Sequence, residues 1–123
     1  MKKIVCFAAT LALVSQTALA LQFTTYTTKN NSTLELQVNQ DNTITGFYTM
    51  ARDIAARICS GITEPRKVIV GTSIEDTVNF TVNYPECNKN MTLGGKLESG
   101  NVFRVTSIRI TSATLAIDES NLI

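Results

Sequence analysis

Short runs in which polar and apolar residues alternate, separated by turn-forming residues, constrain the fold of this chain most strongly. Residues 32–38 place Ser32, Leu34, Leu36 and Val38 on one face and polar side chains on the other. Successive side chains of a β-strand point to opposite faces of a sheet, so this period of two predicts a half-buried strand. The Asn-Gln-Asp-Asn cluster that follows is typical of a hairpin turn, because Asn and Asp tolerate a left-handed backbone.

The alternation recurs and predicts a series of antiparallel strands. Further strands are expected at residues 43–50, 67–72, 77–84, 91–97, 102–111 and, as a short terminal strand, 114–117. A bulge is expected within 102–111, because the apolar residues change parity between Val105 and Ile108. Residues 51–65 break the alternation and have room for one helical turn. Seven or eight short strands joined by hairpins indicate an up-and-down barrel or a sandwich, and about eight strands suffice for a barrel mouth that holds one small ligand.

Charge and histidine content exclude several classes of function. The chain has 11 Lys+Arg against 10 Asp+Glu, a net charge of +1, and no His. It lacks the excess of basic residues typical of nucleic-acid binding. Without His it has no Ser-His-Asp or Cys-His nucleophile, and it lacks the residue found in most zinc sites. The adjacent carboxylates at 75–76 and 118–119 lie in an expected turn and tail, which does not favour acid–base catalysis. We therefore expect no enzymatic activity, no metal and no cofactor.

The first 20 residues have the layout of a secretory signal peptide. The MKK start is positive, residues 4–14 are apolar, and ALA at 18–20 is a small-x-small ending. A transmembrane anchor is the alternative, but the apolar run is shorter than the ~20 residues that span a bilayer. We expect cleavage after Ala20, one domain at residues 21–123, a secreted or periplasmic location, and no membrane association after cleavage.

Cleavage would leave two cysteines, Cys59 and Cys87. An even number of cysteines in an oxidising compartment favours a disulfide between them. Such a bond would stabilise the fold by roughly 3 to 4 kcal/mol in the chain-entropy model. Free or redox-active thiols are the alternative, although no C-x-x-C spacing supports them.

Several segments together resemble the avidin family. YTTKNNSTLELQVNQDNTITGFYT (26–49) resembles its first two strands, KVIVGTSIEDTVNFTVNY (67–84) its fourth and fifth, MTLGGK (91–96) its sixth and TSIRI (106–110) its seventh. The two cysteines fall where disulfide-containing, dimeric bacterial avidins have theirs. The resemblance implies an all-β, up-and-down antiparallel barrel of seven or eight strands that holds biotin in its open end without catalysis.

The resemblance also implies which side chains contact the ligand. Ser32 and Tyr48 match the hydroxyls that donate to the ureido oxygen of biotin, and Thr28 stands where a third donor, Asn, is expected. Met50 replaces the Ser or Thr that accepts from a ureido N–H, so that edge of the ligand has no partner. Ser32 also has a simpler interpretation, as an ordinary hydroxyl at a strand end.

The hydrophobic walls of the expected pocket differ from the family as well. Positions that are aromatic in the family, usually Trp, hold Tyr26, Tyr84, Leu93 and Ile108, and positions that usually carry hydroxyls hold Lys89 and Met91. Because each large aromatic wall buries about 150 to 250 Å², these exchanges predict weaker binding. The tyrosines have an alternative as packing residues at the barrel end, and the methionines as plugs, since flexible thioethers fill irregular gaps.

Three functions remain open. The first is a secreted, homodimeric, avidin-like binder of biotin or a biotin-like ligand with weakened affinity. The second is a secreted protein-interaction barrel with a filled pocket, whose sign would be closure by Met50, Met91 and Tyr84. The third is a structural subunit that pairs through an open sheet edge at residues 110–117.

Overall fold

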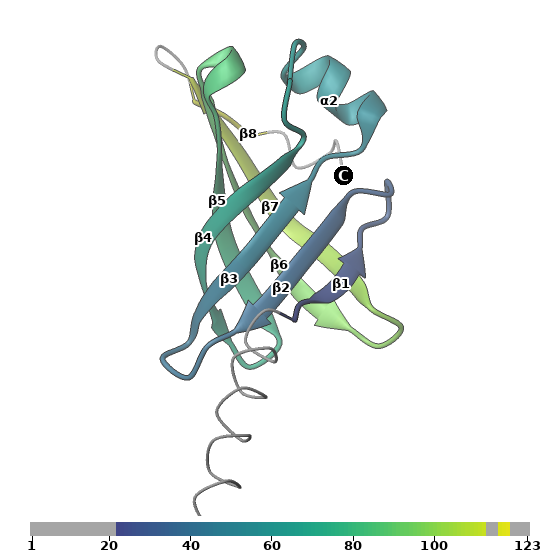
Figure 1. Ribbon diagram of the computed structural model, residues 1–123, viewed down its shortest axis with the longest axis vertical. Coiled ribbons are helices and arrows are strands. Elements are labelled where there is room, and N and C mark those ends of the chain that lie inside the picture. The colour runs from purple at the N-terminus through teal and green to yellow at the C-terminus, as the bar shows by residue number, and fades with distance from the viewer. Residues whose placement is uncertain (1–21, 113–115, 119–123) are drawn as a thin grey trace, which may run out of the picture.

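The computed structural model describes residues 22–112 and 116–118 (Figure 1). The predicted signal peptide, 1–20, lies outside the described residues, as does part of the strand predicted at 114–117. Across the part of the chain that the structure describes, no helix is long and apolar enough to cross a membrane.

Eight strands form one sheet in which neighbours along the chain pair antiparallel. Seven of them close into a barrel, because β1 also pairs with β7 through Thr27 and Val102, in parallel. β8 pairs with residues 109–111 of β7. The predicted up-and-down β-barrel is therefore confirmed, with strands β1 (Thr24–Thr27), β2 (Thr33–Val38), β3 (Thr43–Thr49), β4 (Arg66–Ile74), β5 (Thr77–Tyr84), β6 (Lys89–Glu98), β7 (Val102–Ser112) and β8 (Ala116–Asp118).

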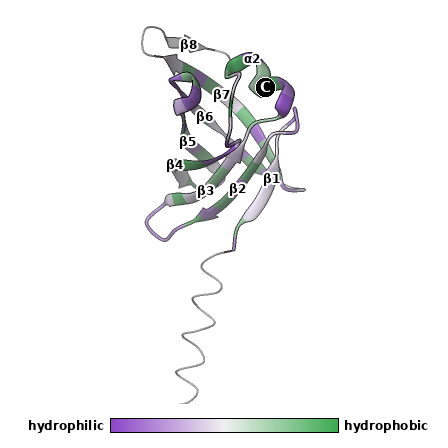
Figure 2. Ribbon diagram, turned by 45° about the horizontal axis from the view of Figure 1, so that its top comes forward, coloured by the Kyte–Doolittle hydropathy of each residue, from purple (hydrophilic) through white to green (hydrophobic). Residues whose placement is uncertain are grey.

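The alternation in sequence becomes an alternation in burial. In β5 every second residue is buried, and these four inward side chains are Val78, Phe80, Val82 and Tyr84. The turns are hydrophilic by contrast, and Figure 2 shows this for the turn between β2 and β3. The interior of the barrel is thus the hydrophobic core of the protein.

Two short helices interrupt the meander. α2 (Arg52–Ile58) forms where alternation stops, and Ile54 and Ile58, one turn apart, are both buried. η1 (Pro85–Cys87) follows β5 directly, and Asn88 then adopts a left-handed φ of 57° that returns the chain into β6 at once. β6 accordingly begins two residues earlier than predicted.

The bulge predicted in β7 is present. Gly94 pairs with Ser107 and Gly95 with Val105, which leaves Thr106 as the extra residue. A Cβ at Gly95 would collide with the carbonyl oxygen of Arg104 on β7, so glycine permits the close approach of the two strands there. Because of the extra residue, Phe103 before the bulge and Ile108 after it both face the barrel interior, although one is odd-numbered and the other even-numbered.

The two ends of the barrel differ. The hairpins β2–β3, β4–β5 and β6–β7 lie at one end, whereas α2 lies at the other, near β8 (Figure 1). We call the second end the capped end.

Candidate functional site

Two tyrosines mark the interior of the barrel toward the capped end. Tyr48 is the last buried residue of β3, and Tyr84 is the last residue of β5. Lys67 of β4 lies between them: it is the Cα partner of Tyr48, and its Nζ is 6.0 Å from the centroid of the Tyr84 ring. Further in, the Tyr48 and Phe80 ring centroids are 5.6 Å apart. The meander therefore brings two phenols from separate strands into one region of the core.

The structure gathers the residues that the sequence singled out for ligand binding. Tyr26 is half-buried and packs against the core cluster. The other seven are at most 4 % exposed, namely Thr28, Ser32, Tyr48, Met50, Tyr84, Leu93 and Ile108. Their roles toward a ligand remain predictions, but all eight lie in or against the core of the barrel.

Neither phenol hydroxyl makes a hydrogen bond of ordinary geometry among the described residues, although the Ser32 hydroxyl lies close enough to that of Tyr48 to lower its pKa. Both oxygens are buried, and a buried polar group without a partner costs about 1 to 3 kcal/mol. The Oγ of Ser32 accepts a hydrogen bond of 2.8 Å from the backbone N–H of Ala51. The core near the capped end therefore holds unused hydrogen-bonding capacity, which is uncommon in a buried region.

The surroundings keep these phenols protonated. Burial raises the pKa of Tyr84 above its ordinary value, and the neighbouring Tyr48 and Glu86 raise it further. Burial also raises the pKa of Tyr48, although nearby Ser32 opposes the rise. Because protonated phenols carry an O–H, both side chains are hydrogen-bond donors at physiological pH.

Thr28 has a different role from the tyrosines. Its hydroxyl donates to Oδ1 of Asn30 at 2.6 Å and accepts from the backbone N–H of Ser32 at 3.0 Å. The resemblance implied that Thr28 would be the third donor to the ligand. Its hydroxyl proton is instead used in the hydrogen bond to Asn30, within the loop between β1 and β2. Thr28 also lines a cavity of about 350 Å³ at the seam between β1 and β7.

The interior around the phenols is filled with side chains. Met91 is 1 % exposed, Met50 4 % and Tyr84 0 %. Met91 and Tyr84 have almost no accessible surface, so other side chains pack around them and the mouth expected from the sequence is filled at these residues. This closure by Met50, Met91 and Tyr84 is the feature expected of a filled barrel.

An open cavity adjoins this filled region. Its volume is about 400 Å³, within the range of ligand pockets. We call it the α2 cavity, and its lining consists of Thr49, Met50, Arg52, Ala55, Ile62 and Pro65. Met50 thus lines the α2 cavity and also belongs to the core cluster.

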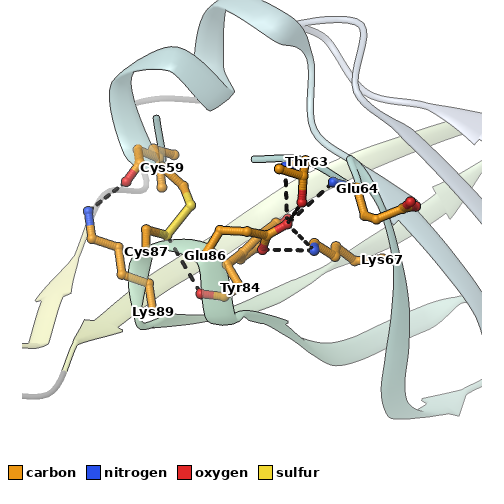
Figure 3. The surroundings of a disulfide bond; sticks show 9 residues. Cys59, Thr63, Glu64, Lys67, Tyr84, Glu86, Cys87 and Lys89 are labelled. Carbon is orange, nitrogen blue, oxygen red and sulfur yellow. Dashed lines mark hydrogen bonds and ion pairs between the residues drawn. A yellow bond between two sulfur atoms is a disulfide. The ribbon is translucent and has the colours of Figure 1, made fainter. Parts of the chain in front are cut away.

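A disulfide and a hydrogen bond fix α2 at the capped end (Figure 3). Cys59, which follows α2, is bonded to Cys87 of η1 with an S–S distance of 2.05 Å, which confirms the predicted disulfide. Lys89 Nζ donates to the carbonyl oxygen of Ile58, the last residue of the helix, at 2.6 Å. A cation suits this position because helix C-terminal carbonyls lack intrahelical partners.

The carboxylate of Glu86 makes a second connection (Figure 3). It accepts from Lys67 Nζ at 2.8 and 2.9 Å, from the N–H and hydroxyl of Thr63 at 3.2 Å each, and from the N–H of Glu64 at 3.3 Å. The Lys67 hydrogen bond is the largest cause that lowers the pKa of Glu86, to about 2. No motif predicts this cluster, because Glu86 is about twenty residues away in sequence from the residues that it binds.

The described residues contain no group of three or more His, Cys, Asp or Glu side chains placed to hold a metal ion.

Comparison with known proteins identifies the barrel type. No protein-family model matches the chain, and no curated protein matches it significantly. Among solved structures it is similar to the crystal structure of a rhizavidin–biotin complex, with a TM-score of 0.60, 17 % identity, and 79 % of this chain and 84 % of that chain covered. The fold is therefore an avidin-like all-β barrel.

Proposed function

We propose that this protein is a small-ligand-binding barrel of the avidin type, which takes up biotin or a biotin-like ligand weakly at its capped end. The observation that carries the proposal is the pair of buried, unpartnered hydroxyls of Tyr48 and Tyr84 inside an avidin-like barrel. A ligand carbonyl oxygen between them would accept from one or both and remove the cost of leaving them unpaired.

Weak affinity follows from the filled interior. A ligand that reaches the phenols must displace the side chains of Met50 and Met91, both buried in the core cluster. Methionine has three rotatable bonds and adapts readily, so displacement is feasible but costs free energy. In addition, Leu93 and Ile108 offer less apolar wall than the aromatic residues that the resemblance leads us to expect.

The proposal includes secretion after cleavage at Ala20, and a homodimer. The motivation for secretion is the N-terminal sequence pattern, with which the Cys59–Cys87 disulfide is consistent. The motivation for the dimer is the position of the two cysteines in the family resemblance. Mass spectrometry of the protein exported by an expressing bacterium tests the cleavage, and sedimentation analysis tests the dimer.

A thermal-shift titration with biotin on oxidised residues 21–123 tests ligand binding. A ligand that binds only the folded state stabilises it by about 2.7 kcal/mol at one hundred times its dissociation constant. We expect a shift at millimolar biotin that Tyr48→Phe reduces. Val70→Ala, which alters a side chain on the outer face that is 73 % exposed, is the control and should keep the shift. No shift at millimolar biotin would refute biotin binding.

The filled interior favours a second candidate, a secreted protein-interaction barrel without a small ligand. Met50, Met91 and Tyr84 then serve only as core. This function predicts that no small molecule raises the melting temperature, and that Met91→Ala only destabilises. The argument for a third function, pairing through an open edge at 110–117, is weakened because residues 109–111 already pair with β8.

A further inference from the structure

We propose that the outer face of β4, β5 and β6 joins two copies of this chain across a two-fold axis. This inference rests on the homodimer of the proposed function and names the surface that forms it. We call this surface the neutral face. It consists of the outward residues of β4 from Val68 to Ile74, of β5 from Thr77 to Asn83, and of β6 from Asn90 to Thr92.

Three large aliphatic side chains of β4 project into solvent. Val68, Val70 and Ile74 are 66 %, 73 % and 72 % exposed, which makes them the most exposed large hydrophobic residues in the part of the chain that the structure describes. Their even-numbered positions alternate with inward residues of the same strand, so all three lie on one outer face. Single exposed apolar residues are ordinary, but several together on one face are typical of an interaction surface.

The neutral face, whose residues all belong to the described part of the chain, carries no charge. Its positions on β5 and β6 hold only Thr and Asn. Charges begin at its borders. On β7, Arg109 is the register partner of Thr92. On the side of β3, the guanidinium of Arg66 lies 3.6 Å from the centroid of the Phe47 ring and pairs with Glu35.

The absence of charge favours a second copy of this chain as the partner. In a two-fold dimer the same surface patch meets itself, so a charge near the axis would face a like charge. An uncharged face avoids this repulsion, while its aliphatic residues gain free energy by leaving water. A strongly charged partner, in contrast, would find no opposite charge at the centre of this face.

Polar side chains in the middle of the face already bond to each other. Val70, Thr81 and Thr92 form one row across the three strands. The hydroxyl oxygens of the two threonines are 3.2 Å apart and share a hydrogen bond. A second copy that covers this row would therefore displace water without leaving both hydroxyls unpaired.

The size of the face predicts a reversible dimer. Three strands about 4.8 Å apart, each with about seven residues that rise about 3.3 Å, span roughly 15 by 23 Å. This is smaller than the about 800 Å² that each partner buries in a standard interface. We therefore expect the dimer to dissociate on dilution.

Sedimentation velocity of oxidised residues 21–123 from micromolar to millimolar concentration tests the face. We expect wild type to pass reversibly from monomer to dimer. Thr81→Lys should raise the dissociation constant by about tenfold or more, because it places two like charges near the axis. Thr25→Lys, the same exchange at an exposed residue of β1 outside the neutral face, is the matched control and should leave the dissociation constant unchanged.

Mixing two variants separates charge repulsion from damage to the fold. Thr81→Lys and Thr81→Asp should each keep the melting temperature of the wild-type monomer, and an equal mixture should associate more tightly than either variant alone. Val68→Thr, which keeps the shape of the side chain and removes apolar surface, should also weaken the dimer. The wild-type dissociation constant should change by less than about threefold between low and high salt, because no charges pair across the face.

Each contrary result has its own meaning. If Thr25→Lys weakens the dimer as much as Thr81→Lys does, or if the mixture associates no better than its components, the interface lies elsewhere and the inference fails while the homodimer stands. If wild type stays monomeric at millimolar concentration, the inference and the homodimer fail together. The thermal shift with biotin is measured on the interior of a single barrel, so it tests ligand binding independently of either result.

Discussion

Gly71 shows how single residues set the shape of the barrel interior. It belongs to the inward face of β4, where a Cβ would collide with the carbonyl oxygen of Asn79 and lie 2.7 Å from the Cβ of Phe80. The missing side chain thus permits the close approach of β4 and β5 at Phe80, whose ring packs near both Tyr48 and Phe103.

We expect Gly71→Ala to lower the free energy of unfolding by about 1 to 3 kcal/mol, because overpacking a tight core forces strands apart. Urea denaturation measures the effect. Thr72→Ala, at the neighbouring outward position, is the matched control and should change stability little. Equal stabilities of Gly71→Ala and wild type would show that β4 and β5 can separate at no cost.

At the residue scale the sequence predicted which side chains face inward, but not which of them lack partners. The family resemblance assigned Tyr48 and Tyr84 to the pocket, and both are buried in the barrel interior. Whether a buried hydroxyl finds a partner depends on neighbours from other strands or on loop conformation, and the Thr28 hydroxyl, which donates to Asn30 within its own loop, is an example of the second. Such contacts depend on register and loop conformation, which a pattern along one strand does not contain.

At the scale of elements, the cap is held by contacts between segments far apart in sequence. The Glu86 side chain is 15 % exposed and that of its partner Lys67 12 %, so this ion pair is shielded more than those on the barrel wall. Its hydrogen bonds to residues 63 and 64 fix the loop that leads from α2 into β4. The alternation of the strands could be predicted, whereas this cluster could not.

The lowered pKa of Glu86 gives the cap a defined pH dependence. A carboxyl whose pKa falls on folding stabilises the native state above its unfolded pKa and loses that contribution as the pH falls through the folded value. With a shift from 4.5 to about 2, stability should decrease between pH 4.5 and 2. Thermal melts across this range should show a steeper decrease for wild type than for Glu86→Gln.

Glu75→Gln, in the turn at the opposite end of the barrel, is the control because it removes one carboxylate outside the cap. If Glu86→Gln follows the wild-type pH profile while Glu75→Gln departs from it, the carboxylate of Glu86 does not govern the acid stability of the cap.

At the scale of the whole molecule, an avidin-like barrel is combined with a mouth that is covered and filled. Periodicity and turn residues predicted the strand order, the bulge and the disulfide, because these follow from local pattern and cysteine count. Closure through Thr27 and Val102 could not be predicted, since it depends on the stagger of the strands around the barrel. Neither could the packing of Ile54 and Ile58 of α2 into the core at the capped end.

The central claim is that the capped end is a ligand site occupied by its own side chains, and calorimetric titration of Met91→Ala with biotin tests it most directly. Removing the fully buried Met91 side chain should lower stability by about 2 to 5 kcal/mol and enlarge the space inside the barrel. The account predicts that this less stable variant binds biotin more tightly than wild type. A destabilised variant that binds biotin no better than wild type would contradict the account.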